Sequence, residues 1–225
     1  MTSVKTPADE AEARAVQDEL RTRVVLDEAG PAVGLGLIAG VDVAYDDERD
    51  LVAAAAVVLD AATLEVVEEA TAVGHVSFPY VPGLLAFREL PTVLAALDAL
   101  SAAPGLVVCD GYGLAHPRGF GLACHLGVVT GLPSIGVAKN PFTFTYEEPG
   151  ARRGDAAPLV AADGAVVGRA LRTQDGIKPV YVSVGHRVSL DNACAQTLAL
   201  SPRFRIPEAT RHADSLCRRA LREAS

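Results

Sequence analysis

Residues 106–128 read LVVCDGYGLAHPRGFGLACHLGV. The apolar run up to Cys109 predicts a buried strand, Asp110 ends it, and the glycines that follow predict a tight loop. From Phe120 onward, apolar residues recur at helical spacing, with His125 among them. In an open α/β sheet, ligands bind at the carboxyl ends of strands, so Asp110 is a candidate functional residue. Taken alone, a buried strand with a chance acidic end explains Asp110 equally well.

The order of elements predicts one α/β domain spanning residues 1–225. Three extended runs with short turns predict an antiparallel meander, and the strands that alternate with helices after it predict parallel pairing. The expected sheet is therefore mixed and five-stranded, with helices on its faces. The expected strands are 33–45, 51–59, 63–76, 105–109 and 132–137, followed by shorter extended pieces at 159–160, 165–171 and 180–184. The expected helices are 7–28, a helix from 83 that restarts after Pro91, the helix of the opening stretch, 189–200 and 207–222.

Composition indicates a folded protein without a membrane or secretory segment. Half of the 225 residues are hydrophobic and 21% are charged, which excludes a disordered chain. No apolar run is long enough to span a membrane, and residues 1–20 are acidic and polar, unlike a secretory signal peptide. We therefore expect a cytoplasmic protein. The four cysteines lack CxxC spacing, so we expect buried thiols, not a disulfide frame or a zinc site.

The charge is unevenly distributed along the chain. The formal net charge of −8 by itself argues against a nucleic-acid partner. However, residues 1–112 carry 6 Lys and Arg against 19 Asp and Glu, whereas residues 113–225 carry 14 basic and 9 acidic residues. This asymmetry allows a basic face for phosphates, although a difference between helix surfaces explains it equally well.

Three carboxylates stand in otherwise apolar surroundings. Asp42 lies within an extended run, Glu89 on the helix after the meander, and Asp110 at the end of a strand. A buried carboxylate is costly unless it is paired or bound to a cation. If the strands that carry Asp42 and Asp110 are neighbours, the three acids meet, and acids gathered without a fixed lysine partner favour a hard divalent cation such as Mg²⁺. Such an ion activates water and neutralises a phosphate leaving group.

Several long sequence motifs resemble those of one known family. They are QDELRTRVVLDE at 17–28, GVDVAY at 40–45, PYVPGLLAFRELP at 79–91, DGYGLAHPRGFGLACHLGV at 110–128, GVAK at 136–139, PGARRGDAAPL at 149–159, VSVGHRVSLDNA at 182–193 and FRIPEATRHAD at 204–214. In this order, and over nearly the whole chain, they resemble endonuclease V, the deoxyinosine 3′-endonuclease family. The resemblance implies an RNase H-like fold.

The same resemblance implies a DNA repair enzyme. It would hydrolyse the second phosphodiester bond 3′ to deoxyinosine with metal-activated water, leaving a 3′-hydroxyl and a 5′-phosphate. The implied cofactor is Mg²⁺, with Mn²⁺ as a substitute, and the implied partner is inosine-containing DNA; we further expect a monomer. Asp42 and Asp110 match the direct metal ligands, and Glu89 completes the site partly through water. The other catalytic residues implied are Lys139, facing the scissile phosphate, His116, His125 and Asp214, with His212 as the weaker candidate on the last helix.

The PYVP segment is similar to the family's wedge, in which an aromatic side chain takes the space left by a flipped base. Tyr80, held between Pro79 and Pro82, matches that aromatic residue, and glycine turns would let the main chain approach the base. The lesion-binding residues implied are Tyr80, Val81, Pro82, Gly83, Leu85, Gly111, Gly113 and Gly121. Arg118, Arg187 and Arg211 are candidate phosphate contacts, although each equally fits a surface ion pair.

Four positions depart from the family pattern. Tyr112 stands where a polar residue such as glutamine is common, Cys124 where serine is common, and Asn140 and Pro141 where basic residues are common. None is an expected metal ligand, so these departures bear on substrate preference more than on catalysis. Two alternatives stay open, an inosine-specific endoribonuclease and a noncatalytic nucleic-acid-binding protein of the same fold. A metal-dependent phosphatase for small substrates would have no use for the PYVP wedge.

Overall fold

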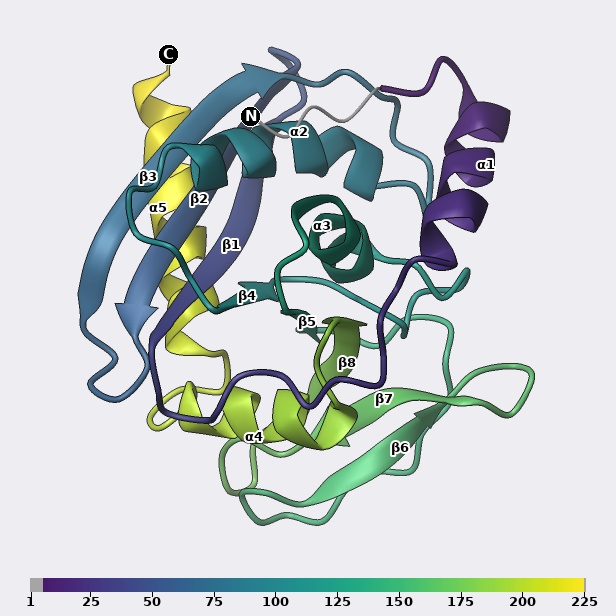
Figure 1. Cartoon of the computed structure of the whole chain (residues 1–225), viewed down its shortest axis with the longest axis vertical. Coiled ribbons are helices and arrows are strands. Elements are labelled where there is room, and N and C mark those ends of the chain that lie inside the picture. The colour runs from purple at the N-terminus through teal and green to yellow at the C-terminus, as the bar shows by residue number, and fades with distance from the viewer. Residues whose placement is uncertain (1–5, 225) are drawn as a thin grey trace.

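One eight-stranded sheet runs through the whole molecule (Figure 1). The structure is a computed structural model, and it describes residues 6–224. Residues 1–5, the start of the polar N-terminal stretch, lie outside the described residues. The strand order is β3-β2-β1-β4-β5-β8-β7-β6. The strands are β1 (Leu37–Asp46), β2 (Leu51–Asp60), β3 (Val66–His75), β4 (Leu106–Cys109), β5 (Ser134–Ala138), β6 (Ala156–Val160), β7 (Val166–Leu171) and β8 (Val180–His186).

The mixed α/β, RNase H-like architecture is confirmed, but the prediction of five strands was wrong. As expected, β1, β2 and β3 form an antiparallel meander, and β4 pairs in parallel with β1 and with β5. The three short extended pieces after residue 158 are β6, β7 and β8, which add an antiparallel extension beyond β5. Their place in the sheet depends on the pairing of β5 with β8. These strands are distant in the sequence, so no local pattern predicts that they pair.

Helices cover both faces of the sheet (Figure 1). On one face lie α2 (Ala86–Asp98) and α3 (Leu122–Thr130), with α1 (Glu10–Arg21) packed on α3; on the other lie α4 (Leu190–Ala199) and α5 (Glu208–Glu223). The alternation of side chains along β4 produces this division, because Val107 and Cys109 join the core under α2 and α3 whereas Leu106 and Val108 join the core under α4. Strand β4 is therefore buried on both faces.

Helix α1 is shorter than the predicted 7–28. Asp9 caps it, accepting the backbone N–H of Glu12, and it ends at Arg21. The chain beyond is held by β8, since the Val25 N–H donates to His186 Nδ1 at 3.2 Å and the Val25 carbonyl accepts the Arg187 N–H at 2.8 Å. These tertiary hydrogen bonds replace the helical ones that the apolar period of the sequence predicts.

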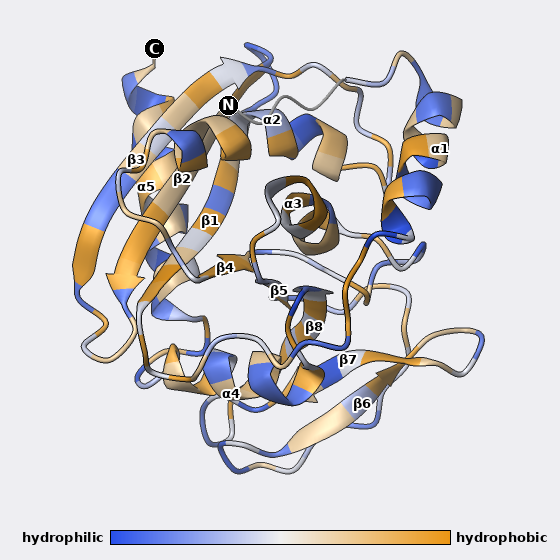
Figure 2. Ribbon diagram, viewed as in Figure 1, coloured by the Kyte–Doolittle hydropathy of each residue, from blue (hydrophilic) through white to orange (hydrophobic). Residues whose placement is uncertain are grey.

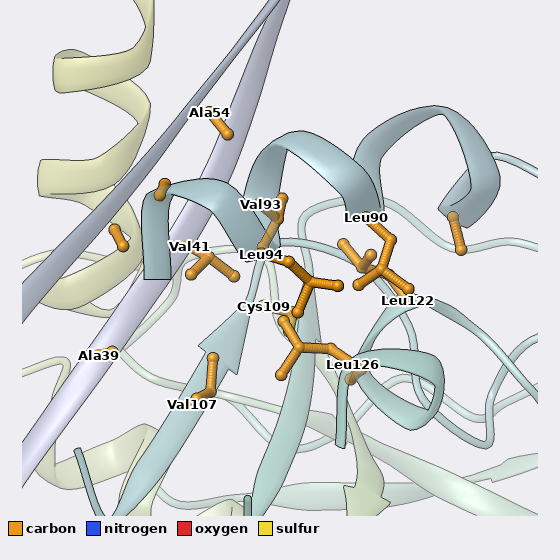
Figure 3. Close-up of a cluster of buried hydrophobic side chains, with 14 of the residues drawn as sticks. Ala39, Val41, Ala54, Leu90, Val93, Leu94, Val107, Cys109, Leu122 and Leu126 are labelled. Atoms are coloured by element: carbon orange, nitrogen blue, oxygen red, sulfur yellow. The ribbon is translucent and has the colours of Figure 1, made fainter. Parts of the chain in front are cut away.

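Helix α2 is continuous, so the predicted restart after Pro91 was also wrong. Pro91 lies inside the helix and removes one backbone donor. Burial compensates, because Leu90, Val93 and Leu94 pack in one cluster with side chains of β1, β4 and α3 (Figure 3). This cluster holds α2 firmly over the carboxyl end of β4.

Figure 2 shows that α3 is hydrophobic nearly all round, whereas the outer face of α1 is hydrophilic. Residues 122–128 of α3 are all buried, between the sheet and helices α1 and α2. All four cysteines are free and buried, as expected. Within residues 6–224, none of the helices combines the length and the apolar character that a membrane span requires.

Candidate active site

The carboxylates meet where β4 ends beside a longer β1. Cys109, the last residue of β4, pairs with Val41, so Asp42 is the first residue of β1 without a β4 neighbour. The Asp110 N–H donates to the Val41 carbonyl at 3.2 Å and brings the second acid to the same point. Glu89 reaches it from α2. The three acids line one cavity of about 210 Å³, named here the carboxylate cavity; its other lining residues are Val41, Val43, Tyr45, Val93 and Leu122.

Lys139, one residue beyond β5, lies among the carboxylates. Its Nζ contacts Asp110 Oδ2 and lies 3.8 Å from Asp42 Oδ2 and 3.6 Å from Asp214 Oδ1 on α5. Burial alone would lower the pKa of Lys139, but the contact with Asp110 outweighs it and raises that pKa. The structure therefore assembles two predicted residues, Lys139 and Asp214, with the acids. The assumption that the acids lack a fixed lysine partner was wrong.

Two of the acids are destabilised as anions. Asp42 Oδ1 accepts the Val43 N–H at 2.8 Å, but Oδ2 is buried and accepts no hydrogen bond from residues 6–224. Burial, and then the nearby Asp110, raise the pKa of Asp42 well above its usual range. Burial raises the pKa of Glu89 to about 7, although the Tyr45 hydroxyl donates to Glu89 Oε1 at 3.1 Å. Negative charge on these acids therefore calls for a further positive charge besides Lys139.

Asp214 differs from the other acids. Arg218, one turn further along α5, donates two hydrogen bonds to it, at 3.0 and 3.1 Å. These bonds, more than any other cause, lower the pKa of Asp214. Asp214 therefore stays anionic and holds the ammonium of Lys139 from the α5 side of the cavity.

The donor chemistry of the carboxylate cavity fits a hard divalent cation. Hard cations take carboxylate oxygens, and Asp42 Oδ2 is a buried oxygen still lacking a hydrogen-bond donor. Within residues 6–224, however, no three acidic, histidine or cysteine side chains stand at metal-shell spacing. The reason is visible in the contacts: Glu89 is turned to Tyr45, and Asp110 to Lys139. Asp42, Asp110 and Glu89 would hold the ion once Glu89 turns from Tyr45, and Asp110 from Lys139, toward it.

A second cavity, of about 250 Å³, adjoins the first and shares Glu89, Asp110 and Leu122 with it. We name it the aromatic cavity, because rings and glycines form most of its walls. Its other lining residues are Gln17, Tyr80, Pro82, Gly83, Leu85, Ala86, Gly111, Tyr112, His116, Phe120, Gly121, Leu122 and Phe142. Burial lowers the pKa of His116 to about 4, so its imidazole is neutral at physiological pH.

Aromatic side chains form the mouth of the aromatic cavity. Tyr80 is 66% exposed, with the Arg88 guanidinium 5.9 Å from its ring. Phe142 stacks on Tyr112, with ring centroids 5.7 Å apart and an interplanar angle of 15°. The Tyr112 hydroxyl donates to the Asn140 carbonyl, which fixes the ring. Tyr112 and Phe142 thus form one side of this rim, and the backbone of Asn140 holds them.

Some predicted residues lie elsewhere. His125 is fully buried against Phe87 and Phe120, outside both cavity linings, and neither ring nitrogen has a hydrogen-bond partner among residues 6–224. Its burial lowers the pKa to about 4. Val81 packs inward in the cluster of Phe78 and Phe87. These two side chains support the aromatic cavity from behind.

Gly113 is also placed for packing within the protein. A Cβ there would lie 1.9 Å from the Val184 carbonyl oxygen, so only glycine allows this approach of the loop to β8. Gly111 does line the aromatic cavity, and its φ of +149° favours glycine. The expectation that all the glycines exist to admit a base is therefore too broad.

The arginines proposed as phosphate contacts are engaged in ion pairs. Arg118 contacts Asp18 at 2.6 Å, Arg187 contacts Glu28 at 3.0 Å, and Arg211 contacts Glu208 at 2.5 Å. His212 Nε2 lies 3.4 Å from the Arg211 guanidinium and 3.8 Å from Glu208. The ion-pair alternative therefore describes all three arginines in this structure.

Sequence reasoning missed Gln17, Tyr45, Arg205 and Phe142. Tyr45 follows Asp42 on the same strand and could have been found from the period of two, which places it on the α2 face with Glu89. Arg205 donates to the carbonyls of Lys139 and Pro179 and so fixes the end of β5. Phe142 lies in a loop without periodicity, and Gln17 resembles any polar residue of an amphipathic helix. Their contacts had no local signal.

Comparison with known proteins agrees with this geometry. The sequence model of the Endonuclease V family matches residues 18–215. Endonuclease V of Streptomyces avermitilis is 76% identical over 229 residues, covering 100% of both chains, and that of Nocardia farcinica is 62% identical over 225 residues, covering 100% of this chain and 98% of the other.

Solved structures show the same likeness. The crystal structure of Endonuclease V from S. avermitilis matches with a TM-score of 0.95 and 78% identity, covering 97% of this chain and 96% of that chain. The catalytic domain of human Endonuclease V matches with a TM-score of 0.89 and 38% identity, covering 97% and 98%. Ciona intestinalis Endonuclease V, in complex with a 24mer DNA containing an inosine followed by a ribo-adenosine, matches with a TM-score of 0.83 and 28% identity, covering 96% and 98%. Family match and structure together show that this chain belongs to the Endonuclease V family, whose members are nucleases.

Proposed function

We propose that the protein is a DNA repair enzyme that cleaves DNA at the second phosphodiester bond 3′ to deoxyinosine, leaving a 3′-hydroxyl and a 5′-phosphate. The observation that carries the proposal is the sharing of Glu89 and Asp110 between the carboxylate and aromatic cavities. A site for phosphate chemistry thus lies directly beside a pocket suited to a flat ring. The Ciona relative binds inosine-containing DNA, which supports the assignment of the ring as hypoxanthine.

Asp42, Asp110 and Glu89 would hold Mg²⁺, which would polarise a water and neutralise the charge that develops on the departing 3′-oxygen. Lys139 would then face the scissile phosphate and offset developing negative charge, with Asp214 holding its ammonium in place. Tyr80 would fill the space that the flipped nucleotide leaves. Neutral His116, with Nδ1 accepting the Arg118 N–H at 3.2 Å, would line the pocket without adding charge.

Inosine-containing RNA is a second candidate substrate. The DNA bound by the Ciona relative carries a ribo-adenosine directly after the inosine, so that protein accepts a ribose on the 3′ side. In this chain, aromatic rings and glycines make up most of the lining of the aromatic cavity, and such residues distinguish bases better than sugars.

The deciding experiment incubates the purified chain and Mg²⁺ with three matched oligonucleotides, each with one inosine: all-DNA, DNA with a ribonucleotide after the inosine, and all-RNA. We expect metal-dependent cutting at the second bond 3′ to the inosine in DNA, with no cutting of the inosine-free strand. Sequencing of the product ends locates the cut. A folded protein that cuts none of the three would refute the nuclease proposal; cutting of RNA alone would favour the second candidate.

A further inference from the structure

Two loops lie beside Lys139 at the edge of the sheet where the carboxylates meet. They are residues 172–179, which precede β8, and residues 200–207, which precede α5. Strand β8 pairs antiparallel with β5, so the residues just before β8 lie beside Lys139, which follows β5. Lys178 is therefore a neighbour of Lys139 along this edge.

Arg205 joins the two loops to the end of β5. Its Nη2 donates to the Lys139 carbonyl and, at 2.8 Å, to the Pro179 carbonyl. Its Nε donates to the Lys178 carbonyl at 2.9 Å, and its own carbonyl accepts the Thr173 hydroxyl at 2.7 Å. One guanidinium thus holds the main chain of both lysines. The two loops form one connected surface, named here the basic platform.

The basic platform presents cations to solvent. Lys178 and Arg203 are exposed, and neither pairs with an acid in the part of the chain that the structure describes. Asp175, the one acid in the two loops, accepts the Arg153 N–H at 2.5 Å. Phe204 is 49% exposed, and an exposed ring among cations is typical of surfaces that hold a nucleic-acid strand. The platform therefore has the charge and the composition of a phosphate-binding surface.

The proposed substrate strand would run from the aromatic cavity toward the basic platform. Side chains of α1, α2 and α3 line that cavity, whereas residues 200–207 connect α4 and α5 on the opposite face of the sheet. A strand with its inosine in the aromatic cavity and its scissile phosphate at Lys139 therefore continues over the sheet edge toward this loop. Because the cut lies 3′ to the inosine, the segment that arrives there is the one beyond the cut.

We propose that Lys178 and Arg203 bind backbone phosphates of the substrate strand on the 3′ side of the cleaved bond. This inference rests on the proposed function. The contacts would be electrostatic and independent of base sequence, so they add affinity for any strand long enough to reach the platform. Arg205 is a positioning residue, because its donors fix the main chain of Lys139 and Lys178.

The test varies the length of DNA beyond the cut. Two inosine strands share the same 5′ arm; the long strand continues well past the second bond 3′ to the inosine, and the short strand ends at the first nucleotide after it. Both carry a methylphosphonate at that bond, which resists hydrolysis, so Kd can be measured by fluorescence anisotropy with Mg²⁺ present. Lys178→Gln and Arg203→Gln should each weaken binding of the long strand about three- to tenfold and reduce its salt-dependence slope by about one. Binding of the short strand should stay the same.

Arg23→Gln is the matched control. Arg23 is also exposed, but it precedes Val25, whose N–H donates to His186 at the other end of β8. Its loss removes the same charge away from the platform and should change both affinities equally, by less than about twofold. Equal losses on the two strands in Lys178→Gln and Arg203→Gln, or no loss on either, would overturn the inference and leave the proposed function intact. Failure of the unsubstituted protein to cleave ordinary inosine DNA would overturn both.

Discussion

The carboxylate cavity and the aromatic cavity share Glu89 and Asp110 but are stabilised in opposite ways. The first contains acids whose pKa values burial raises, and a buried Asp42 oxygen without a donor. The second is already assembled, by the stacking of Phe142 on Tyr112 and by the close approach of Gly113 to β8. The difference teaches that the chemical half of the site holds more buried acids than its one lysine, Lys139, neutralises, whereas the recognition half needs only a base of the right shape.

Asp110→Asn should separate cleavage from binding most clearly. The substitution keeps the size of a residue that lines both cavities but removes a charge that would hold the metal. Because a bound metal contributes several kcal/mol to the transition state, cleavage at inosine should fall about a thousandfold or more. Binding of inosine DNA, measured by fluorescence anisotropy, should persist. Near-normal turnover in this variant would remove Asp110 from the metal site.

Glu89→Gln should have the opposite kind of effect on the carboxylate cavity, because we expect this substitution to stabilise the protein. The folded-state pKa of Glu89 is about 7 against an ordinary 4.5, so between these pH values the folded state holds a proton that the unfolded state has lost. The free energy of unfolding therefore falls as pH rises through this window. The variant, neutral at every pH, should be about 1–3 kcal/mol more stable at pH 8 and no more stable at pH 4.

Urea unfolding in the presence of a chelator, at pH 4 and pH 8, measures this effect. Gln can still accept the Tyr45 hydroxyl, so that hydrogen bond need not be lost. Glu147→Gln, at an exposed position, is the control and should change stability by less than about 0.5 kcal/mol. A gain in Glu89→Gln that is equal at both pH values would mean that packing, not charge, is responsible.

The same contrast explains what the sequence could predict. Asp42, Glu89 and Asp110 were recognisable because a charge inside an apolar period is locally improbable. The pairing of β1 with β4, which brings Asp42 and Asp110 together, was only a condition at the level of sequence, and the structure supplies it. Lys139 was recognisable only as the end of GVAK, and its contacts with three acids depend on β1, β4, β5 and α5 together.

The aromatic cavity was harder to predict, because its walls come from loops and from the buried side of α1. Nothing local distinguishes Gln17 from the exposed polar residues of the same helix. His125 shows the converse case: its motif indicated a site residue, and the structure buries it within α3, outside the linings of both cavities. The pairing of β5 with β8 was not predicted for a similar reason, since a long segment that contains the β6–β7 hairpin separates the two strands in the sequence.

Tyr80→Ala should affect recognition without affecting the carboxylate cavity. Tyr80 is 66% exposed and lines only the aromatic cavity, so its removal leaves the acids in place. Stacking of a base on an aromatic ring contributes about 1–3 kcal/mol, so binding to inosine duplex should weaken roughly 10- to 100-fold. Binding to unmodified duplex should change much less, and Tyr80→Phe should restore most of the loss. Equal losses on both duplexes would contradict the wedge role.

The smallest effect should come from Phe142→Ala, at the rim of the aromatic cavity beside Tyr112. The stacked pair of Phe142 and Tyr112 contributes about 0.5–1.5 kcal/mol beyond its buried area, so binding to inosine DNA should weaken about threefold. If the pair acts as a unit, Tyr112→Gln should produce a similar loss and the double variant little more, measured as a double-mutant cycle in binding free energy. Additive losses would mean that each ring contacts the substrate separately. Because Phe142 lines the aromatic cavity and not the carboxylate cavity, the cleavage rate of bound substrate should stay unchanged in all three variants.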